Sequence, residues 1–318
     1  MQGALYLMKK ILITGAAGYL GSMICTRLVN EGFKVTAVDI LKYDKNSLAH
    51  LFFQKNFIFF NLDITKKENL KKIIKNQDFI IPLAAVVGAP LCEKRKKEAK
   101  RVNVNSIKLL IKLIKKKQKI IYPTTNSGYG VGQKSKYCDE NTPLRPISLY
   151  GRTKVEAEKI VSKHTNYVSF RLATVFGYSY RMRTDLIVNN FVDTAIKNRK
   201  LEIFEPNFRR NFIHIKDVAE AFLFAIKNFS RLRNNVYNLG LSTANISKLN
   251  LAKKIKKIIP KTKVMVNKSG SDPDKRDYFV SNAKIEKKGF KAKISLNEGI
   301  RELYGVLKHC KIKFINNY

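Results

Sequence analysis

The chain has 318 residues and a formal net charge of +38, because 62 lysines and arginines face only 24 acidic residues. Its hydrophobic content of 45% is ordinary for a folded protein, and this length can bury a large core as one or two domains. No apolar run reaches the ~18 residues of a membrane-spanning helix. The first ten residues are too short for a signal peptide. Four scattered cysteines fit a reducing environment, so we expect a cytoplasmic protein.

The excess of positive charge could indicate nucleic-acid or membrane binding. The lysines, however, alternate with apolar positions along helical segments, as in KKENLKKIIKN and KLLIKLIKKKQK, instead of forming one basic tail. We interpret them as solvated helix faces, so that nucleic acid is an unlikely partner. The four cysteines and four histidines show no ligand spacing, which predicts no metal site.

The first predicted unit is a strand, a glycine-rich turn, a helix and a second strand. Ile11–Thr14 form a buried strand, the helix runs to about Asn30, and residues 34–38 form the next strand. The turn carries Gly15, Gly18 and Gly21 in the spacing that lets backbone approach a pyrophosphate at a helix N-terminus. This context predicts a dinucleotide site.

Asp39 closes the second strand, where a carboxylate can accept both ribose hydroxyls of the adenosine. The carboxylate would repel a 2′-phosphate, which favours NAD over NADP. Neighbouring lysines such as Lys42 leave NADP as an alternative.

Short apolar strands alternate with helices as far as about residue 174, which predicts a Rossmann-type α/β fold with a doubly wound parallel sheet. We assign residues 1–176 and 211–240 to a dinucleotide-binding domain, and residues 177–210 and 241–318 to a smaller substrate-binding lobe. One long helix is expected over residues 92–117 and another over 181–197. Further strands are expected at 57–61, 79–83, 120–124, 167–172, 201–204 and 236–239, and further helices at 215–228 and 296–308.

Tyr150 and Lys154 lie four residues apart in SLYGRTKVEAE and therefore on one helical face. An ammonium beside a phenol favours the phenolate and is expected to lower the pKa of Tyr150. Thr125 in YPTTNSGYG follows a strand and supplies a hydroxyl. The three residues form a candidate proton-abstracting set.

These motifs together resemble the extended short-chain dehydrogenase/reductase superfamily, in its nucleotide-sugar epimerase/dehydratase branch, over nearly the whole chain. The likeness includes sugar 4-epimerases and 4-dehydrogenases, among them those that act on GDP-heptoses, and implies surface polysaccharide biosynthesis. It implies Thr125, Tyr150 and Lys154 as catalytic residues and NAD as cofactor. The implied NAD-binding residues also include Gly15, Gly18, Tyr19, Leu20, Gly21, Asp39, Asp63, Ile64, Leu83, Ala84 and Ala85.

The residues after Thr125 discriminate within this branch. The family's 4,6-dehydratases carry an Asp-Glu pair there, whereas this chain has Asn126 and Ser127, which cannot act as that acid–base pair. The resemblance therefore implies hydride transfer at C4 of a GDP- or UDP-linked sugar, either as an epimerase or as a dehydrogenase. Asn126, Ser127, Asn190, Arg210 and Arg276 are the implied substrate contacts.

Two other classes of protein remain as alternatives, a Rossmann-fold RNA-binding protein and a non-catalytic dinucleotide sensor. The intact set of Thr125, Tyr150 and Lys154 argues against both, because a binder has no need of catalytic residues. By analogy with relatives we expect a homodimer that pairs the helices at about 92–117 and 148–164.

Overall fold

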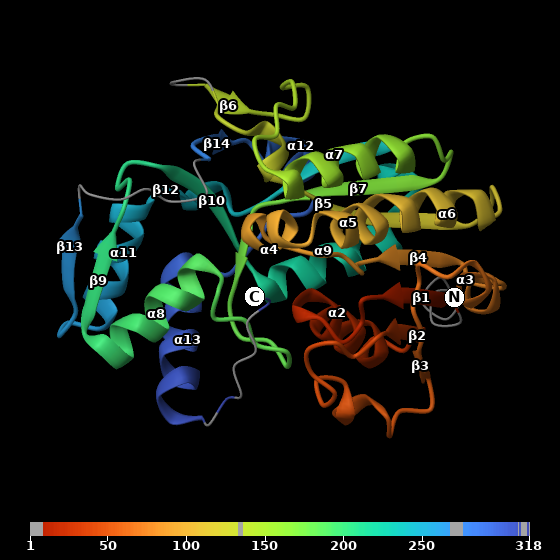
Figure 1. Cartoon of the computed structure of the whole chain (residues 1–318), viewed down its shortest axis with the longest axis horizontal. Coiled ribbons are helices and arrows are strands. Elements are labelled where there is room, and N and C mark those ends of the chain that lie inside the picture. The colour runs from red at the N-terminus through yellow and green to blue at the C-terminus, as the bar shows by residue number, and fades with distance from the viewer. Residues whose placement is uncertain (1–8, 133–135, 268–275, 311, 313–316, 318) are drawn as a thin grey trace.

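The computed structural model describes residues 9–132, 136–267, 276–310, 312 and 317. Its centre is a seven-stranded sheet in the order β11-β7-β5-β4-β1-β2-β3, and all its strand pairs are parallel (Figure 1). This confirms the predicted doubly wound fold. The strands are β1 (Lys10–Thr14), β2 (Lys34–Asp39), β3 (Phe57–Asn61), β4 (Phe79–Pro82), β5 (Lys119–Thr125), β7 (Tyr167–Leu172) and β11 (Asn235–Leu239).

Helices cover both faces of this sheet, which explains why its inner strands are continuous apolar runs. On one face α2 (Tyr19–Asn30) packs against α9 (Ile215–Lys227). On the other face, α3 (Lys67–Ile74) and α7 (Leu149–Val161) both pack against α6 (Ser106–Leu113). All four residues of β4 are buried as a result.

The single helix expected over residues 92–117 is wrong. The segment is divided into α4 (Ala89–Lys94), α5 (Lys96–Lys100), a π-helical turn (Arg101–Asn105) and α6. Within the π-helical turn the Asn103 side chain accepts a hydrogen bond from Val86 N at 2.8 Å and donates one to Val86 O at 2.9 Å. We attribute the turn to this buried amide, whose partner lies 17 residues earlier and is invisible to helical periodicity.

Outside the main sheet the chain forms small sheets and three longer helices, on the left of Figure 1. The helix expected over 181–197 begins only at Ile187. The carbonyl of Arg183 accepts a hydrogen bond from Asn189 Nδ2 at 2.8 Å, and residues 184–186 form bends. The elements are β8 (Thr174–Phe176), β10 (Arg209–His214) and β12 (Asn245–Ser247) in one sheet, the pair β9 (Lys200–Ile203) and β13 (Lys263–Val266), α8 (Ile187–Asn198), α11 (Lys248–Ile258) and α13 (Leu296–His309). Shorter elements are β6 (Tyr137–Cys138), which pairs with β14 (Phe279–Val280), and the helices α10 (Phe229–Leu232) and α12 (Ala283–Lys287).

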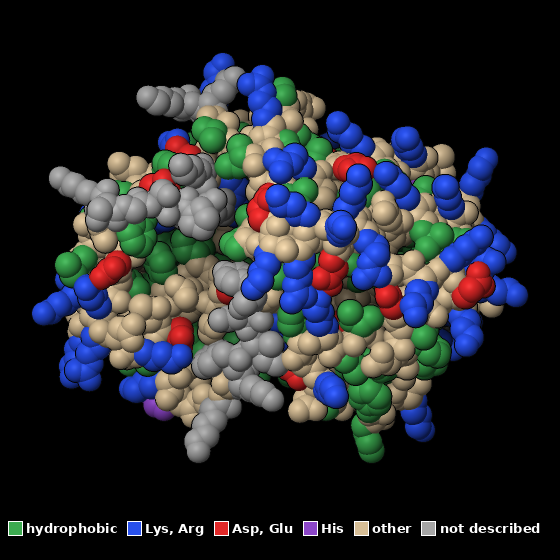
Figure 2. Space-filling model, in the orientation of Figure 1, with side chains coloured by type: hydrophobic (Ala, Val, Ile, Leu, Met, Phe, Trp, Pro, Cys, Tyr) green, Lys and Arg blue, Asp and Glu red, His purple; other side chains and the backbone are tan. Residues whose placement is uncertain are grey.

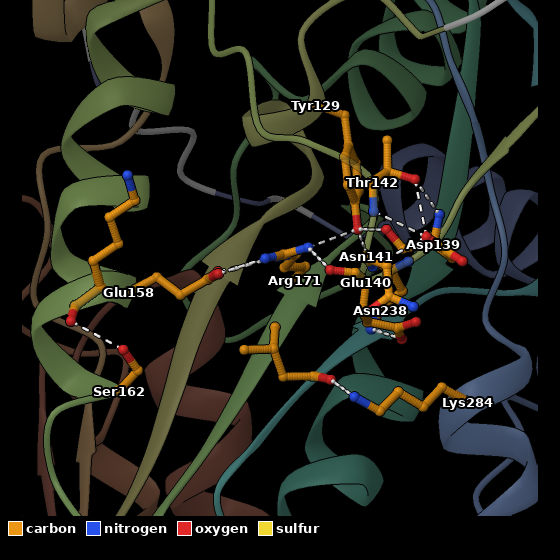
Figure 3. Close-up of polar contacts among 12 residues, drawn as sticks. Tyr129, Asp139, Glu140, Asn141, Thr142, Glu158, Ser162, Arg171, Asn238 and Lys284 are labelled. Atoms are coloured by element: carbon orange, nitrogen blue, oxygen red, sulfur yellow. Dashed lines mark hydrogen bonds and ion pairs between the residues drawn. The ribbon is translucent and has the colours of Figure 1, made fainter.

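A buried polar network fixes α7 to the sheet (Figure 3). Arg171 on β7 donates to Glu158 on α7 at 2.7 Å, and both side chains are only 7% exposed. The same guanidinium donates to Tyr129 Oη at 3.0 Å and to Glu140 O at 3.1 Å, and Asn238 N on β11 donates to Glu140 Oε1 at 2.7 Å. A buried ion pair with its remaining donors satisfied sets the position of the helix that carries Tyr150 and Lys154.

Lysine and arginine side chains are spread over both lobes on the face shown in Figure 2. They form no single stripe on that face. This distribution is the one expected of solvated helix surfaces.

Candidate active site

A cavity of about 770 Å³ is lined by one end of the main sheet and by residues of α8, β9 and α11. Residues directly after β1, β2, β3, β4 and β7, and the last residue of β5, line it, so it lies at the carboxyl ends of the parallel strands. Eighteen of the nineteen residues predicted to bind cofactor or substrate, or to catalyse, line this cavity, and Asn126 is the exception.

The glycine turn brings backbone close to the cavity. Gly15 has φ +72°, and a Cβ there would lie 2.5 Å from Ala84 N, so the turn after β1 admits only glycine without a shift. A Cβ on Gly21 would lie 2.2 Å from Gly15 O, which shows how tightly α2 packs on the turn. Because α2 begins at Tyr19 without a side-chain cap, its free N–H groups are available to an anion.

Backbone N–H groups hold the Asp39 carboxylate in place. Its carboxylate accepts hydrogen bonds from Ala17 N at 3.0 Å and Leu41 N at 2.8 Å. Burial raises the pKa of Asp39 above its usual value, and those N–H groups oppose the rise. A carboxylate has about four acceptor positions, so capacity remains for ribose hydroxyls.

These two features fit a bound dinucleotide, with an uncapped helix N-terminus for the pyrophosphate and a positioned carboxylate for the adenosine ribose. Asp63 lines the cavity beyond β3, where Thr65 N and Oγ1 each donate to it at 2.8 Å. Burial alone would raise the pKa of Asp63, but these bonds and Arg101 lower it below its usual value. The phenol of Tyr19 serves the lobe junction, because its Oη donates to Gly177 O at 2.6 Å.

Thr125, Tyr150 and Lys154 all line this cavity, and the side chains of Thr125 and Tyr150 form a hydrogen bond. Thr125 ends β5, and its Oγ1 donates to Ser127 Oγ at 2.9 Å. Ser148 caps α7 by accepting from Gly151 N at 3.1 Å, which places Tyr150 and Lys154 on the first turns. Lys154 is 5% exposed, and its Nζ lies 4.2 Å from the centre of the Tyr122 ring.

The structure corrects the expected acidity of Tyr150. Burial raises the pKa of Tyr150 to about 12, although Arg276, Arg183 and Thr125 oppose the rise. Burial likewise lowers the pKa of Lys154 to about 7, against the opposing charge of Glu158. The charged form of each group is disfavoured by the same low-polarity surroundings, so proximity of the ammonium alone does not make the phenol acidic.

The predicted substrate contacts separate into two groups. Ser127, Asn190, Arg210 and Arg276 line the cavity, and Arg276 Nη1 donates to Ser127 Oγ. Asn126 is 1% exposed and does not line the cavity, and within the described chain its side-chain atoms have no hydrogen-bond partner. The structure therefore does not bring Asn126 to the other predicted substrate contacts.

Several cavity residues escaped the sequence reasoning. Glu202, Phe204, Lys248 and Asn317 all line the cavity, and Arg181 donates to Asn317 Oδ1 at 2.6 Å. They belong to no motif and lie far apart in sequence. The only available signal was the alternation of strand β9, which puts residues 202 and 204 on one face.

His214 is buried, and its Nε2 lies 2.7 Å from Glu302 Oε2. Among the residues that the structure describes, no group of histidine, cysteine and acidic side chains could hold a metal ion. No helix in the same part of the chain is long and apolar enough to cross a membrane.

A doubly wound sheet with a dinucleotide turn and a Tyr/Lys pair in one cavity defines a class of nicotinamide-dependent enzymes. The match is specific: residues 11–240 fit the family model for the NAD-dependent epimerase/dehydratase family, and the chain belongs to that family. NAD is the cofactor of this family.

Relatives span nearly the whole chain. A dTDP-D-glucose 4,6-dehydratase of Bos taurus is 27% identical, covering 92% of this chain and 87% of the relative. A putative UDP-glucose 4-epimerase of Methanocaldococcus jannaschii is 26% identical, covering 94% and 98%. Among solved structures, the UDP-glucuronic acid 4-epimerase of Bacillus cereus with UDP-glucuronic acid and NAD superposes with a TM-score of 0.84 at 25% identity, covering 94% and 99%.

Proposed function

We propose that this enzyme oxidises C4 of a nucleotide-diphosphate sugar to a 4-keto sugar, as a 4-epimerase or a 4-dehydrogenase. The observation that carries the proposal is the convergence of Thr125, Tyr150 and Lys154 in a cavity that has no dehydratase-type acid pair beside Thr125. Bound NAD supplies the hydride acceptor for this chemistry.

Tyr150 takes the proton of the sugar hydroxyl, and Thr125 Oγ1 orients the sugar oxygen by a hydrogen bond. Since the pKa of Tyr150 is about 12, the phenolate needs a neighbouring positive charge to form near neutral pH. Lys154, with a pKa of about 7, carries that charge for part of the population. A charged Lys154 on the same helical face then favours the phenolate.

Dehydration is disfavoured by the residues that follow Thr125. Elimination of water needs a second acid–base group, whereas Ser127 is neutral and Asn126 lies outside the cavity lining. Cys138 is 2% exposed, and burial raises the pKa of its thiol. It therefore offers no replacement acid.

Incubation with UDP-, GDP- and dTDP-sugars tests the proposal. An epimerase would give a product of unchanged mass without accumulation of reduced nicotinamide. A dehydrogenase would give a loss of two hydrogens together with the absorbance of NADH. Loss of water from the sugar would overturn our assignment of the residues after Thr125.

We keep the division into residues 1–176 with 211–240 and residues 177–210 with 241–318, because β11 returns to the main sheet beside β7. We further propose a cytoplasmic homodimer that acts in surface polysaccharide biosynthesis. Its cytoplasmic location is supported by four unpaired cysteines, Cys25, Cys92, Cys138 and Cys310. Light scattering in solution measures the assembly, and a monomeric mass would reject the dimer.

A further inference from the structure

Strand β9 presents an acidic side chain to the second-lobe end of the cavity. Leu201 and Ile203 are each 1% exposed and point into the core, whereas Glu202 and Phe204 line the cavity. The Glu202 side chain is 45% exposed, and its Oε1 lies 2.6 Å from Lys200 Nζ. This carboxylate has no role in the proton transfer at Tyr150.

The order of residues along the cavity indicates which part of a substrate reaches β9. Asp39, at the adenosine end, belongs to β2, and β2 and β9 lie at opposite ends of the molecule in Figure 1. In that view β5 lies between them, and its last residue, Thr125, forms a hydrogen bond with Tyr150. Arg276 contacts Ser127 beside the catalytic residues, while Lys248 Nζ donates to Phe204 O at 2.9 Å. A sugar held at Tyr150 therefore directs its diphosphate toward the arginines and its base toward β9.

We propose that Glu202 recognises the nucleobase and selects guanine, so that the substrate is a GDP-linked sugar. This inference rests on the proposed function. A carboxylate only accepts hydrogen bonds, through two oxygens side by side. Guanine presents the matching pair of adjacent donors, N1–H and N2–H.

Other bases match this carboxylate less well. Uracil and thymine present a single N3–H between two carbonyl oxygens, which a carboxylate repels, and adenine presents one donor beside an acceptor nitrogen. Phe204 and Phe191 line the same end of the cavity and offer apolar surface to the plane of the base. Apolar contact with the plane of a base does not distinguish one base from another, so we assign the selectivity to Glu202.

Titration calorimetry of the NAD-loaded protein with GDP, UDP and dTDP tests the inference. We expect GDP to bind about tenfold or more tightly than UDP, the ratio that hydrogen bonds to a charged group typically supply. Glu202→Gln replaces one acceptor oxygen with a donor NH₂ group. It should abolish the preference by weakening the binding of GDP. Glu68→Gln, on the exposed surface of α3, removes the same charge and should leave the ratio unchanged.

The outcomes separate the two proposals. If UDP or dTDP binds as tightly as GDP, or if Glu202→Gln keeps the preference, guanine selection by Glu202 is overturned while the C4 chemistry stands. If NAD binds but no nucleoside diphosphate does, the proposed function fails, and the inference fails with it. Unchanged NAD affinity in Glu202→Gln confirms that the variant is folded.

Discussion

The two ends of the cavity are built in different ways. At the cofactor end, most of the predicted contacts are backbone groups. Gly15 and the N-terminus of α2 come from one short segment, which hydrogen-bonds to Asp39. At the substrate end, side chains from distant segments converge, with Arg210, Lys248 and Arg276 on separate elements. A site made of backbone is encoded by local sequence, whereas a site made of converging side chains depends on the folded lobe.

The largest effect on catalysis is expected at Tyr150. Tyr150→Phe removes the proton acceptor and should lower kcat by about 10²–10⁴-fold, because general-base catalysis contributes that much. Affinities for NAD and for the nucleoside diphosphate should both persist, as calorimetry would measure. Tyr137→Phe, an exposed phenol, is the matched control. Full activity of Tyr150→Phe would remove Tyr150 from the mechanism.

The whole folded protein should lose stability when the buried ion pair that holds α7 to the sheet is broken. Arg171→Met leaves Glu158 buried without its partner and should lower the free energy of unfolding by about 3–5 kcal/mol, as denaturant titration would show. Lys108→Met breaks the exposed pair with Glu156 and should cost about 1 kcal/mol or less. Adding Glu158→Leu to Arg171→Met should recover part of the loss. Equal effects of the two single variants would contradict the importance of the buried network.

The cofactor end alone should respond to Gly15→Ala. The new Cβ would occupy a left-handed backbone position and collide with Ala84 N, so we expect a loss of about 1–3 kcal/mol in unfolding free energy and weaker NAD binding. Gly305→Ala on α13 meets nothing within 4 Å and should be neutral or stabilising. If Gly15→Ala bound NAD normally, the close approach of backbone to cofactor would be refuted.

The smallest effect per step is a pH dependence of the unfolding free energy, set by Lys154. Its folded pKa of about 7 lies below the unfolded value of roughly 10.4, so above pH 7 the unfolded chain retains a proton that the folded protein has lost. The free energy of unfolding should therefore gain up to about 1.4 kcal/mol per pH unit from this residue between pH 7 and 9. Lys154→Met should remove that slope, while Lys115→Met, an exposed lysine, should keep it. A slope that survives in Lys154→Met would assign it to another group.

Sequence periodicity recovered the elements whose cause is local. The strands of the main sheet and the start of α7 follow from apolar runs and a serine cap, and both were placed within a few residues. The π-helical turn was missed because it depends on Asn103 reaching Val86. The late start of α8, where the side chain of Asn189 binds Arg183 O, was also missed.

The sequence by itself determined the dinucleotide turn, the Tyr/Lys pair and the parallel sheet, because each arises from residues close together in the chain. Only the tertiary structure decided that Glu202 and Phe204 face the cavity, that Asn126 lies outside its lining, and that Tyr150 and Lys154 are less ionised than their spacing implies. Burial and long-range contacts control these properties, and a local sequence pattern determines neither of them.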